Sequence, residues 1–418
     1  MTDHISFTYN NNTKKMTIKN LTKMAAVAAL LTAGFASCSD DDNANTSRVP
    51  GTQEALQQAC DDWRTARANW ENSEAFLFGA ADVYSIDPHT DTWPVAANDL
   101  ANVLRDASAM SNLTEFLKTA KANIVGYHGI EYVLFRNGIA RNINDITNLE
   151  YNYICAVAED LYNATATLEA TWDSSESNAE RKKIAQEYVA SHYSIDDDGN
   201  VTDEGFSYEN FGKEFKNPSA SNARWKTNLE ATQEIISGCI DIIGEVGDSK
   251  IGLPHTGEDV TYVESPYAWN SIQDFYDNII SCRNALYGSV DATTPSSNSV
   301  IYFCLNSNNA TLKAQAAEVQ TKLAAALAAI KPGMKYPFVQ YYADSSCQTA
   351  MDALGELSTA LDNLNGTLGS YAGNETVETQ CKAINANYVD NVVVATYRTL
   401  ANNAYTLWQS IKNIKANQ

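Results

Sequence analysis

Helical periodicity, sustained over almost the whole chain, is the feature that most constrains the fold. Apolar residues recur every three or four positions in one segment after another, and the last of these segments carries Val393, Tyr397, Leu400, Ala404, Leu407, Ile411 and Ile414. Alternating strand patterns are nearly absent, and no proline occurs between Pro94 and Pro218. The sequence therefore predicts an all-α protein whose long helices pack as bundles.

The predicted division into domains depends on length and on one polar stretch. A chain of 418 residues, 44% of them hydrophobic, can bury two separate cores. Residues 194–217 include the acidic run Asp196-Asp197-Asp198-Gly199-Asn200, which lacks a complete calcium loop and is interpreted as a solvated turn in a connection or insertion. We predict helical-bundle domains over 52–215 and 216–418. Their similar size is what a duplication would produce, although no residue-level repeat relates them.

Residues 1–37 are predicted to be a lipoprotein signal peptide. Four lysines precede the apolar run 24–35, which is too short to span a bilayer permanently, and Ala36-Ser37-Cys38 follows it. Small residues directly before a cysteine resemble the bacterial lipobox, so we expect Cys38 to be the lipidated first residue of the mature chain. Met16 is an alternative start that would give a signal of more ordinary length.

The polar segment 38–51 lacks apolar periodicity and is predicted to be a tether. The run Ser39-Asp40-Asp41-Asp42 after Cys38 resembles the surface-export signal of lipoproteins in the Bacteroides group, and a solvated acidic spacer is the alternative. We therefore expect an outer-membrane lipoprotein of the bacterial cell envelope. It would be held to the membrane by its lipid and would face either the surface or the periplasm.

Composition argues against two kinds of site. Acidic residues outnumber basic ones by 51 to 29 without a basic, aromatic-rich stretch, which disfavours nucleic acid as a partner. The cysteines beyond Cys38 are far apart and form no CxxC pair, so a structural zinc site is not indicated and most are expected to be buried thiols. These cysteines are Cys60, Cys155, Cys239, Cys282, Cys304, Cys347 and Cys381.

His128 and Glu131 form the first candidate site. Residues three apart on a helix share a face, so the imidazole and the carboxylate can converge on one point at the edge of a packed core. Gly126 and Gly129 are poor helix formers whose missing side chains leave room beside His128. A metal site is one interpretation, and a hydrogen-bonded core histidine is the other.

Charged and aromatic residues outside this pair suggest a larger constellation. Trp63, Arg67, Trp70 and Glu74 fall on one helical face that ought to be buried, and a buried carboxylate needs either a basic partner such as Arg67 or a metal. A structural ion pair is the alternative interpretation. Residues 84–94, rich in aromatic and ligand-type side chains, are expected to be a loop lining a site.

A second expected loop spans residues 244–266. It contains His255 and Glu258, which repeat the spacing of His128 and Glu131, and it ends in Glu264-Ser265-Pro266.

Taken in order along the chain, these stretches resemble the imelysin family. The matching segments are Trp70-Glu71-Asn72-Ser73-Glu74-Ala75-Phe76 with Phe78-Gly79, Ile86-Asp87-Pro88 to Trp93-Pro94, Gly126-x-His128-x-x-Glu131, Glu264-Ser265-Pro266 and Val394-Ala395-Thr396-Tyr397-Arg398. The resemblance implies two domains, each built around a four-helix bundle, with the GxHxxE motif near their interface. It also implies that His128 and Glu131 are metal ligands.

Further site residues are inferred from their matches to the other motifs. Glu74 and Glu264 are predicted as additional ligands. The predicted motif and pocket residues are Gly126, Arg67, Trp70, Asp87, Trp93 and Ser265.

Three functions remain open on this basis. The first is an envelope lipoprotein that binds a divalent metal for iron acquisition together with iron-uptake proteins. One histidine with several carboxylates suits iron, and also manganese or zinc. The second is a metallopeptidase, the class in which the family was placed, which needs an open metal position and a separate base. The third is a module that binds a ligand without metal on the aromatic stretch 84–93.

Overall fold

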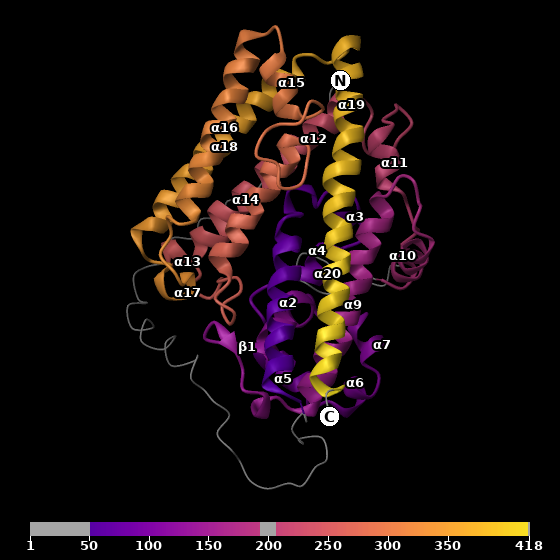
Figure 1. The fold of residues 1–418 in the computed structure, drawn as a ribbon, viewed down its shortest axis with the longest axis vertical. Helices are drawn as coiled ribbons and strands as arrows, with labels where there is room; N and C mark the ends of the chain where they lie inside the picture. Colours follow the sequence, from indigo (N-terminus) through magenta and orange to yellow (C-terminus); the bar gives the residue numbers. More distant parts are fainter. Residues whose placement is uncertain (1–50, 193–205, 417–418) are drawn as a thin grey trace, which may run out of the picture. The chain divides into compact units, whose positions relative to one another are not determined.

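The structure, a computed structural model, describes residues 51–192 and 206–416. The predicted signal peptide, Cys38, the tether as far as residue 50 and the acidic run Asp196 to Asn200 lie outside the described residues. Within them the chain is almost entirely helical, which confirms the all-α prediction (Figure 1). One antiparallel hairpin pairs β1 (Phe135–Arg136) with β2 (Ile139–Ala140).

Nine long helices make up about half of the described residues. They are α2 (Gln53–Glu71), α9 (Asn148–Trp172), α10 (Ala179–Ser191), α12 (Asn228–Gly244), α14 (Ser271–Tyr287), α16 (Ala310–Ile330), α18 (Ser345–Gly369), α19 (Glu375–Tyr388) and α20 (Val394–Ala416). Shorter helices connect them: α3 (Ala80–Val83), α4 (Ile86–Asp91), α5 (Ala97–Val103), α6 (Ala107–Ser111), α7 (Leu113–Leu117), α8 (Gly126–Leu134), α11 (Phe211–Lys216), α13 (Gly252–Thr256), α15 (Val300–Asn306) and α17 (Phe338–Tyr341). Single 3₁₀ turns are η2 (Glu74–Phe76), η3 (Ala122–Ile124) and η4 (Ile143–Asp145), and the π-helical segments are η5 (Glu245–Ile251) and η6 (Val389–Val393).

The first helix group consists of α2, α8, α9, α10 and α20. Helix α20 packs along both α9 and α2, α10 covers α9, and α8 contacts α2 and α9. Helix α9 begins with a capping box, in which the side chains of Thr147 and Glu150 bind each other's backbone amides and satisfy donors at the helix start. This group holds the GxHxxE segment on α8 against the first helix of the described chain.

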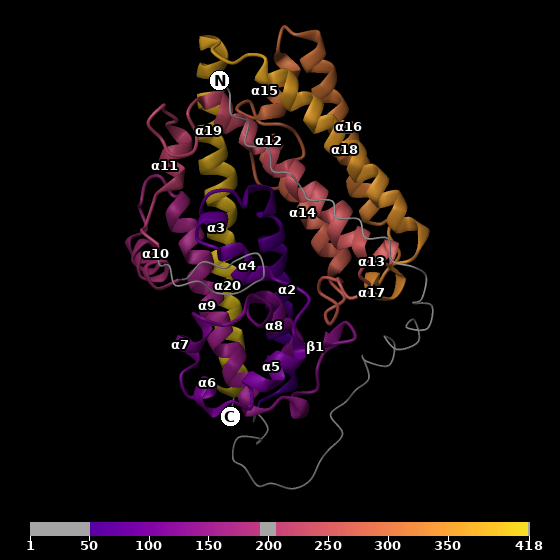
Figure 2. The ribbon, with the colours of Figure 1, turned by 180° about the vertical axis from the view of Figure 1, so that it is seen from behind.

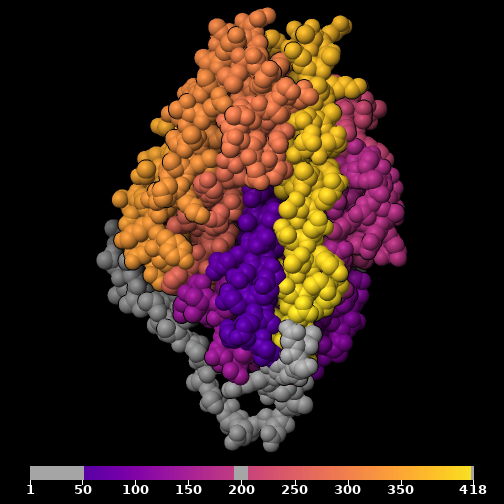
Figure 3. Space-filling view, viewed as in Figure 1, coloured from indigo at the N-terminus to yellow at the C-terminus, as the bar shows by residue number. Residues whose placement is uncertain are grey.

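The second helix group consists of α12, α14, α16, α18 and α19. Helices α16 and α18 run side by side, while α12 contacts α14, α18 and α19 (Figures 1 and 2). Helix α14 also packs on α2, and the space-filling view shows α2 between α20 and the second group (Figure 3). The domain boundary near residue 215 and the duplication stay predictions.

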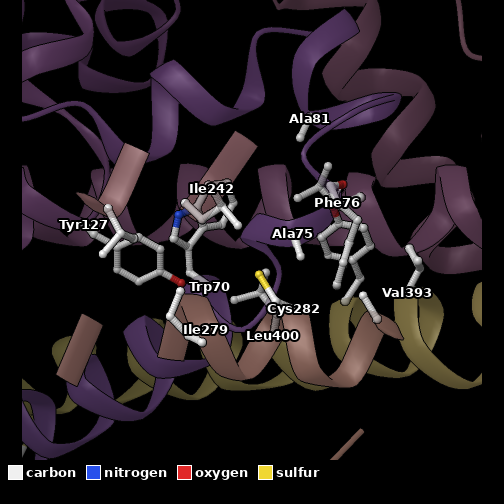
Figure 4. Close-up of a cluster of buried hydrophobic side chains, with 14 of the residues drawn as sticks. Trp70, Ala75, Phe76, Ala81, Tyr127, Ile242, Ile279, Cys282, Val393 and Leu400 are labelled. Atoms are coloured by element: carbon white, nitrogen blue, oxygen red, sulfur yellow. Dashed lines mark hydrogen bonds between the residues drawn. The ribbon is translucent and has the colours of Figure 1, made fainter. Parts of the chain in front are cut away.

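A continuous apolar core joins the two groups. Trp70 of α2, Ile242 of α12, Ile279 of α14 and Leu400 of α20 lie together in the close-up and are each at most 1% exposed (Figure 4). Burial of such side chains contributes about 1.5–3 kcal/mol each relative to exposure. The periodicity that predicted helices therefore also marks the residues that hold the helices together.

Two stretches expected to be loops are partly helical. Residues 86–91 form α4, since Pro88 lies in its first turn, where a missing amide hydrogen costs nothing. Residues 245–256 continue α12 through η5 and α13, because Val246 and Ile251 are fully buried and η5 packs on α18. The glycines of this stretch therefore do not end the helix as their number suggested.

No helix in the described ranges is both long enough and apolar enough to cross a membrane. The seven cysteines after Cys38 are free thiols, and all except Cys155 are buried, as expected.

Candidate functional site

A set of buried charged and polar side chains lies where α2, α4, α8, η5 and α14 approach one another. We call it the buried charge cluster. Its members, each at most 4% exposed, are Arg67, Glu71, Glu74, Asp91, His128, Glu131, Lys250, Glu264, Asp274 and Asn278. Six carboxyl groups therefore face only two side chains that are always cationic, and such charges are retained in an interior only when they are paired or bind a ligand.

Close backbone approach brings α8 into this cluster. Gly126 has a φ of 65°, and a Cβ there would lie 2.0 Å from the carbonyl oxygen of Thr90 at the end of α4. A Cβ on Gly129 would lie 2.6 Å from the hydroxyl of Tyr153 on α9. The space beside His128 that the glycines predicted is thus filled by neighbouring protein, and Gly126 sets how near His128 comes to Asp91.

Glu131 holds the imidazole of His128 in place. Its Oε2 lies 2.9 Å from His128 Nδ1, which confirms that the two side chains share a helical face. Its Oε1 accepts hydrogen bonds from the backbone amides of Tyr267 and Ala268, both at 2.8 Å. The two amides hold the carboxylate of Glu131 in place. Since this carboxylate contacts Nδ1, the opposite ring nitrogen, Nε2, points away from Glu131.

Three ligand atoms meet on the other side of that ring. Side-chain atoms of Asp91, His128 and Glu264 lie within 4.8 Å of one another, and all three residues are buried. His128 Nε2 is 3.1 Å from Asp91 Oδ1 without forming a hydrogen bond, and Glu264 Oε2 has no hydrogen-bond partner in the part of the chain that the structure describes. A second such group in the described residues, Glu71, Glu74 and Asp91, adjoins the first.

Arg67 is the central cation of the cluster. It forms ion pairs with Glu71, Asp91 and Glu264, and its Nη2 lies 2.8 Å from Glu264 Oε1. Its Nε also lies 3.6 Å from Asp274 Oδ1. Arg67 thus pairs with one oxygen of Asp91 and one oxygen of Glu264, and Glu264 Oε2 keeps no hydrogen-bond partner within the described ranges.

Lys250 of η5 is the second cation. Its Nζ lies 3.0 Å from Glu74 Oε2 and 3.1 Å from Glu264 Oε1. Glu74 also accepts a hydrogen bond from Trp70 Nε1 at 3.0 Å. The basic partner expected for Glu74 is therefore present, but it is Lys250 and not Arg67.

The acid–base properties of the cluster reflect its surplus of carboxyl groups. Burial raises the pKa of Glu74 well above its usual range despite Lys250, and it raises the pKa of Asp274 to about 7 against the attraction of Arg67. Burial alone would raise the pKa of Asp91, yet Arg67 and His128 hold it well below its usual range. Asp91 is thus kept ionised by its neighbours, whereas the pKa values of Glu74 and Asp274 stay raised although a cation lies beside each of them.

A cavity of about 360 Å³ adjoins the cluster. Glu74 and Asp91 line its inner side, and Asp87, Trp93 and Glu245 line the rest together with neighbouring residues. The side chain of Glu245 is 41% exposed, so this cavity reaches toward solvent. Burial, followed by the charge of Glu245, raises the pKa of Asp87 to about 8. The cavity thus extends from Asp91 toward the solvent-exposed side chain of Glu245.

The remaining predicted residues fall into two places. Ser265 has a φ of 48° and lies in the turn that sends Glu264 into the cluster and the amides of Tyr267 and Ala268 to Glu131. The second HxxE pair lies elsewhere: His255 Nδ1 is 2.8 Å from the carbonyl oxygen of Tyr342. Among the described residues, that histidine belongs to neither three-residue group.

Sequence reasoning missed several members of the cluster. Asp91 stands within the ligand-rich stretch 84–94 but has no characteristic spacing to His128. Lys250 lies in a stretch expected to be a loop, whereas it is a buried residue of the π-helical segment η5. The others are Glu71, Asp274 and Asn278, which sit on helices whose polar residues look solvated in sequence.

Comparison of the sequence with known protein families identifies the family of this chain. A sequence model of the imelysin family, also called peptidase M75, matches residues 24–386, and the chain therefore belongs to the imelysin family.

Individual relatives support the same assignment. Iron-regulated protein A of Synechococcus elongatus is 23% identical over 235 residues, which cover 56% of this chain. The chain spans about half (52%) of that relative's length. A candidate iron-regulated protein A precursor from Parabacteroides distasonis has a crystal structure that matches with a TM-score of 0.59 at 24% identity, over 76% of this chain and 84% of that one. An imelysin peptidase from Bacteroides ovatus matches with a TM-score of 0.50 at 27% identity, over 64% and 68%.

Proposed function

We propose that this chain is a cell-envelope protein that binds a divalent cation through Asp91, His128 and Glu264 and serves iron acquisition. The observation that carries the proposal is the convergence of ligand atoms from three buried residues. Among the described residues, Glu264 Oε2 has no hydrogen-bond partner, and His128 Nε2 has only the 3.1 Å approach to Asp91 Oδ1. One imidazole nitrogen with two carboxylate oxygens is a set that suits iron, manganese and zinc.

Neighbouring residues hold these ligands in place. Glu131 fixes the ring of His128, and Arg67 and Lys250 hold the other oxygen of Glu264. A bound cation would supply the positive charge that the surplus carboxyl groups lack. In this arrangement Glu74 and Glu131 support the site from outside, and whether either binds the cation directly stays a prediction.

Iron is favoured by the names of two relatives, both described as iron-regulated. We extend this to a role in iron uptake, with uptake proteins as partners and a lipid anchor on Cys38 as the membrane attachment. The anchor is tested by Cys38→Ala, which should abolish lipid labelling and membrane partition of the full chain. Unchanged labelling would exclude lipoprotein processing at that residue.

Calorimetric titration of ferrous iron, manganese and zinc into the full chain tests the site itself. The parent should bind at least one of these ions, and His128→Ala should weaken that binding at least tenfold. The matched control is His255→Ala, which changes the other HxxE histidine outside the cluster and should bind as the parent does. If the parent binds none of the ions, or His128→Ala binds equally well, the proposal fails.

A second comparison distinguishes the carboxylate proposed to bind the cation from the one that orients His128. Glu264→Gln removes a proposed ligand, whereas Glu131→Gln alters only the group that orients His128, a kind of change that costs about 10–100-fold in affinity. We expect the larger loss for Glu264→Gln. Peptide cleavage by the metal-loaded parent that stops on chelation would instead favour the metallopeptidase alternative.

A further inference from the structure

A groove on the second helix group differs in chemistry from the buried charge cluster. It has a volume of about 480 Å³ and is bounded by α15, the residues on either side of that helix, Tyr371, and the part of α19 up to Ile384. Both ribbon views place α15 and α19 near each other at the top of the picture (Figures 1 and 2). Small-molecule sites commonly enclose about 300–1,000 Å³, so the groove has room for a ligand of that class.

The groove is lined by neutral side chains alone. Its fifteen lining residues include no acidic or basic one, although the chain as a whole carries a net charge of −22. Six of them are amides: Asn298, Asn306, Asn308, Asn309, Asn374 and Gln380. Without a charged partner, the groove offers little to a phosphate, a carboxylate or an ammonium group.

Half of these amides already have a structural role. Asn309 and Asn374 cap α16 and α19 by accepting hydrogen bonds from backbone amides, and Asn306 donates to the carbonyl oxygen of Tyr302 at 2.8 Å. The side chains of Asn298, Asn308 and Gln380 have no hydrogen-bond partner within the described ranges. Helix capping therefore does not account for these other amides, which remain available to a ligand.

Aromatic rings lie beside the free amides. Tyr302 is 42% exposed, and Tyr371 accepts a hydrogen bond from Asn309 Nδ2 at 3.0 Å, which fixes its ring in the groove. Phe303 adds a third ring. An aromatic face provides a large apolar contact at low conformational cost.

We propose that this groove binds a neutral carbohydrate. An amide presents a donor and an acceptor side by side, which matches neighbouring hydroxyl groups of a sugar, and an aromatic ring matches the apolar face formed by the C–H bonds of a pyranose. Both chemistries and the absence of charge occur together in this groove. The inference is independent of the proposed cation site.

Saturation-transfer NMR of the full chain with maltose, cellobiose, lactose, mannobiose, xylobiose and chitobiose tests the proposal, and titration calorimetry gives the Kd of any sugar with a signal. At least one sugar should bind with a millimolar or lower Kd. Tyr302→Ala and Gln380→Ala should each weaken it at least fivefold, since both side chains are exposed and their removal leaves the core intact.

Two controls keep the result specific. Tyr336→Ala removes another exposed tyrosine, 60% exposed and outside the groove, and should bind as the parent does. His128→Ala should also bind the sugar normally. An uncharged peptide, acetylated and amidated at its ends, is measured beside the sugars. The proposal is overturned if no sugar binds, if both groove variants bind like the parent, or if the peptide binds and the sugars do not.

Discussion

Leu400 on α20 and Lys250 in η5 are both fully buried, but one lies among apolar side chains and the other among carboxyl groups. Shortening Leu400 removes packing and leaves its neighbours otherwise satisfied. Removing the charge of Lys250 leaves Glu74 and Glu264 without a cation in an interior that disfavours lone charges. A substitution in the apolar core therefore affects stability mainly through the contacts of the residue changed. A substitution in the buried charge cluster also changes the free energy of the charged groups that remain.

The largest effect is expected for Lys250→Met. Breaking a buried ion pair by removing one partner destabilises a protein by about 3–5 kcal/mol, because the remaining charge stays buried. Urea denaturation of the parent and the variant measures the difference. Adding Glu264→Gln to Lys250→Met should recover part of the loss, since the double variant lacks one of the stranded carboxylates.

The exposed pair formed by Lys322 and Glu356, with 2.8 Å between Nζ and Oε2, provides the control. Lys322→Met should leave the denaturation midpoint unchanged, because solvent screens an exposed pair. Equal effects of Lys250→Met and Lys322→Met would show that the cluster is not energetically coupled.

A somewhat smaller loss is expected for Leu400→Ala. Truncating a fully buried leucine costs about 2–5 kcal/mol, which combines lost transfer energy with the cavity left behind. Thr399→Ala, at the neighbouring exposed position, should stay within about 0.5 kcal/mol of the parent. A Leu400→Ala variant as stable as Thr399→Ala would contradict the packing of α20 described above.

Two buried histidines extend the comparison to pH. Burial opposes charge on His128, but Asp91 and Glu131 raise its pKa to about 9, while burial, aided by His89, lowers the pKa of His192 to about 3. His192 is neutral in the fold and would be protonated below about pH 6.5 in the unfolded chain. Its contribution to stability is therefore present above that pH and is lost as pH falls toward 3.

We expect the stability of the parent, relative to His192→Gln, to fall by about 1.4 kcal/mol for each pH unit between pH 6 and 4. Denaturation of both proteins at several pH values measures this difference, which cancels the titration of all other groups. A difference that does not change with pH would mean that His192 takes up its proton in the folded state.

The smallest effect is expected for a neutral hydrogen bond at a helix end. Thr147→Ala removes the cap of α9 and should cost about 1 kcal/mol. Thr147→Ser keeps the hydroxyl and should retain most of the stability. A loss for Thr147→Ala as large as that for Lys250→Met would remove the distinction between coupled charges and local polar contacts.

The sequence predicted the helical fold well because helix faces repeat locally. Val393, Leu400 and Ile411 recur at helical spacing and are all fully buried. Segments where glycine and proline gather were harder, since their propensity for turns is overridden by packing. Residues 245–256 stay helical because Val246 and Ile251 are buried, a tertiary effect that no local pattern records.

The candidate site was predictable only where its residues are neighbours in sequence. His128 and Glu131 are three apart and could be paired by spacing alone. Asp91 and Lys250 reach the same cluster from separate segments, and nothing in their surroundings specifies the fold that unites them. Glu264 was found through its match to a family motif and not through any physical pattern.

The packing of α20 along α2 and α9 has a consequence for how the molecule folds. Helix α2 comes first among the described elements and α20 comes last, so the surfaces of α2 and α9 that contact α20 stay uncovered until nearly all the intervening chain has been synthesised. Contacts so distant in sequence must close a long loop before they contribute, and they are typical of slow folding. Docking of α20 is therefore expected to be a late step of folding. A chain that lacks this helix should expose apolar surface on α2 and α9 and aggregate more readily.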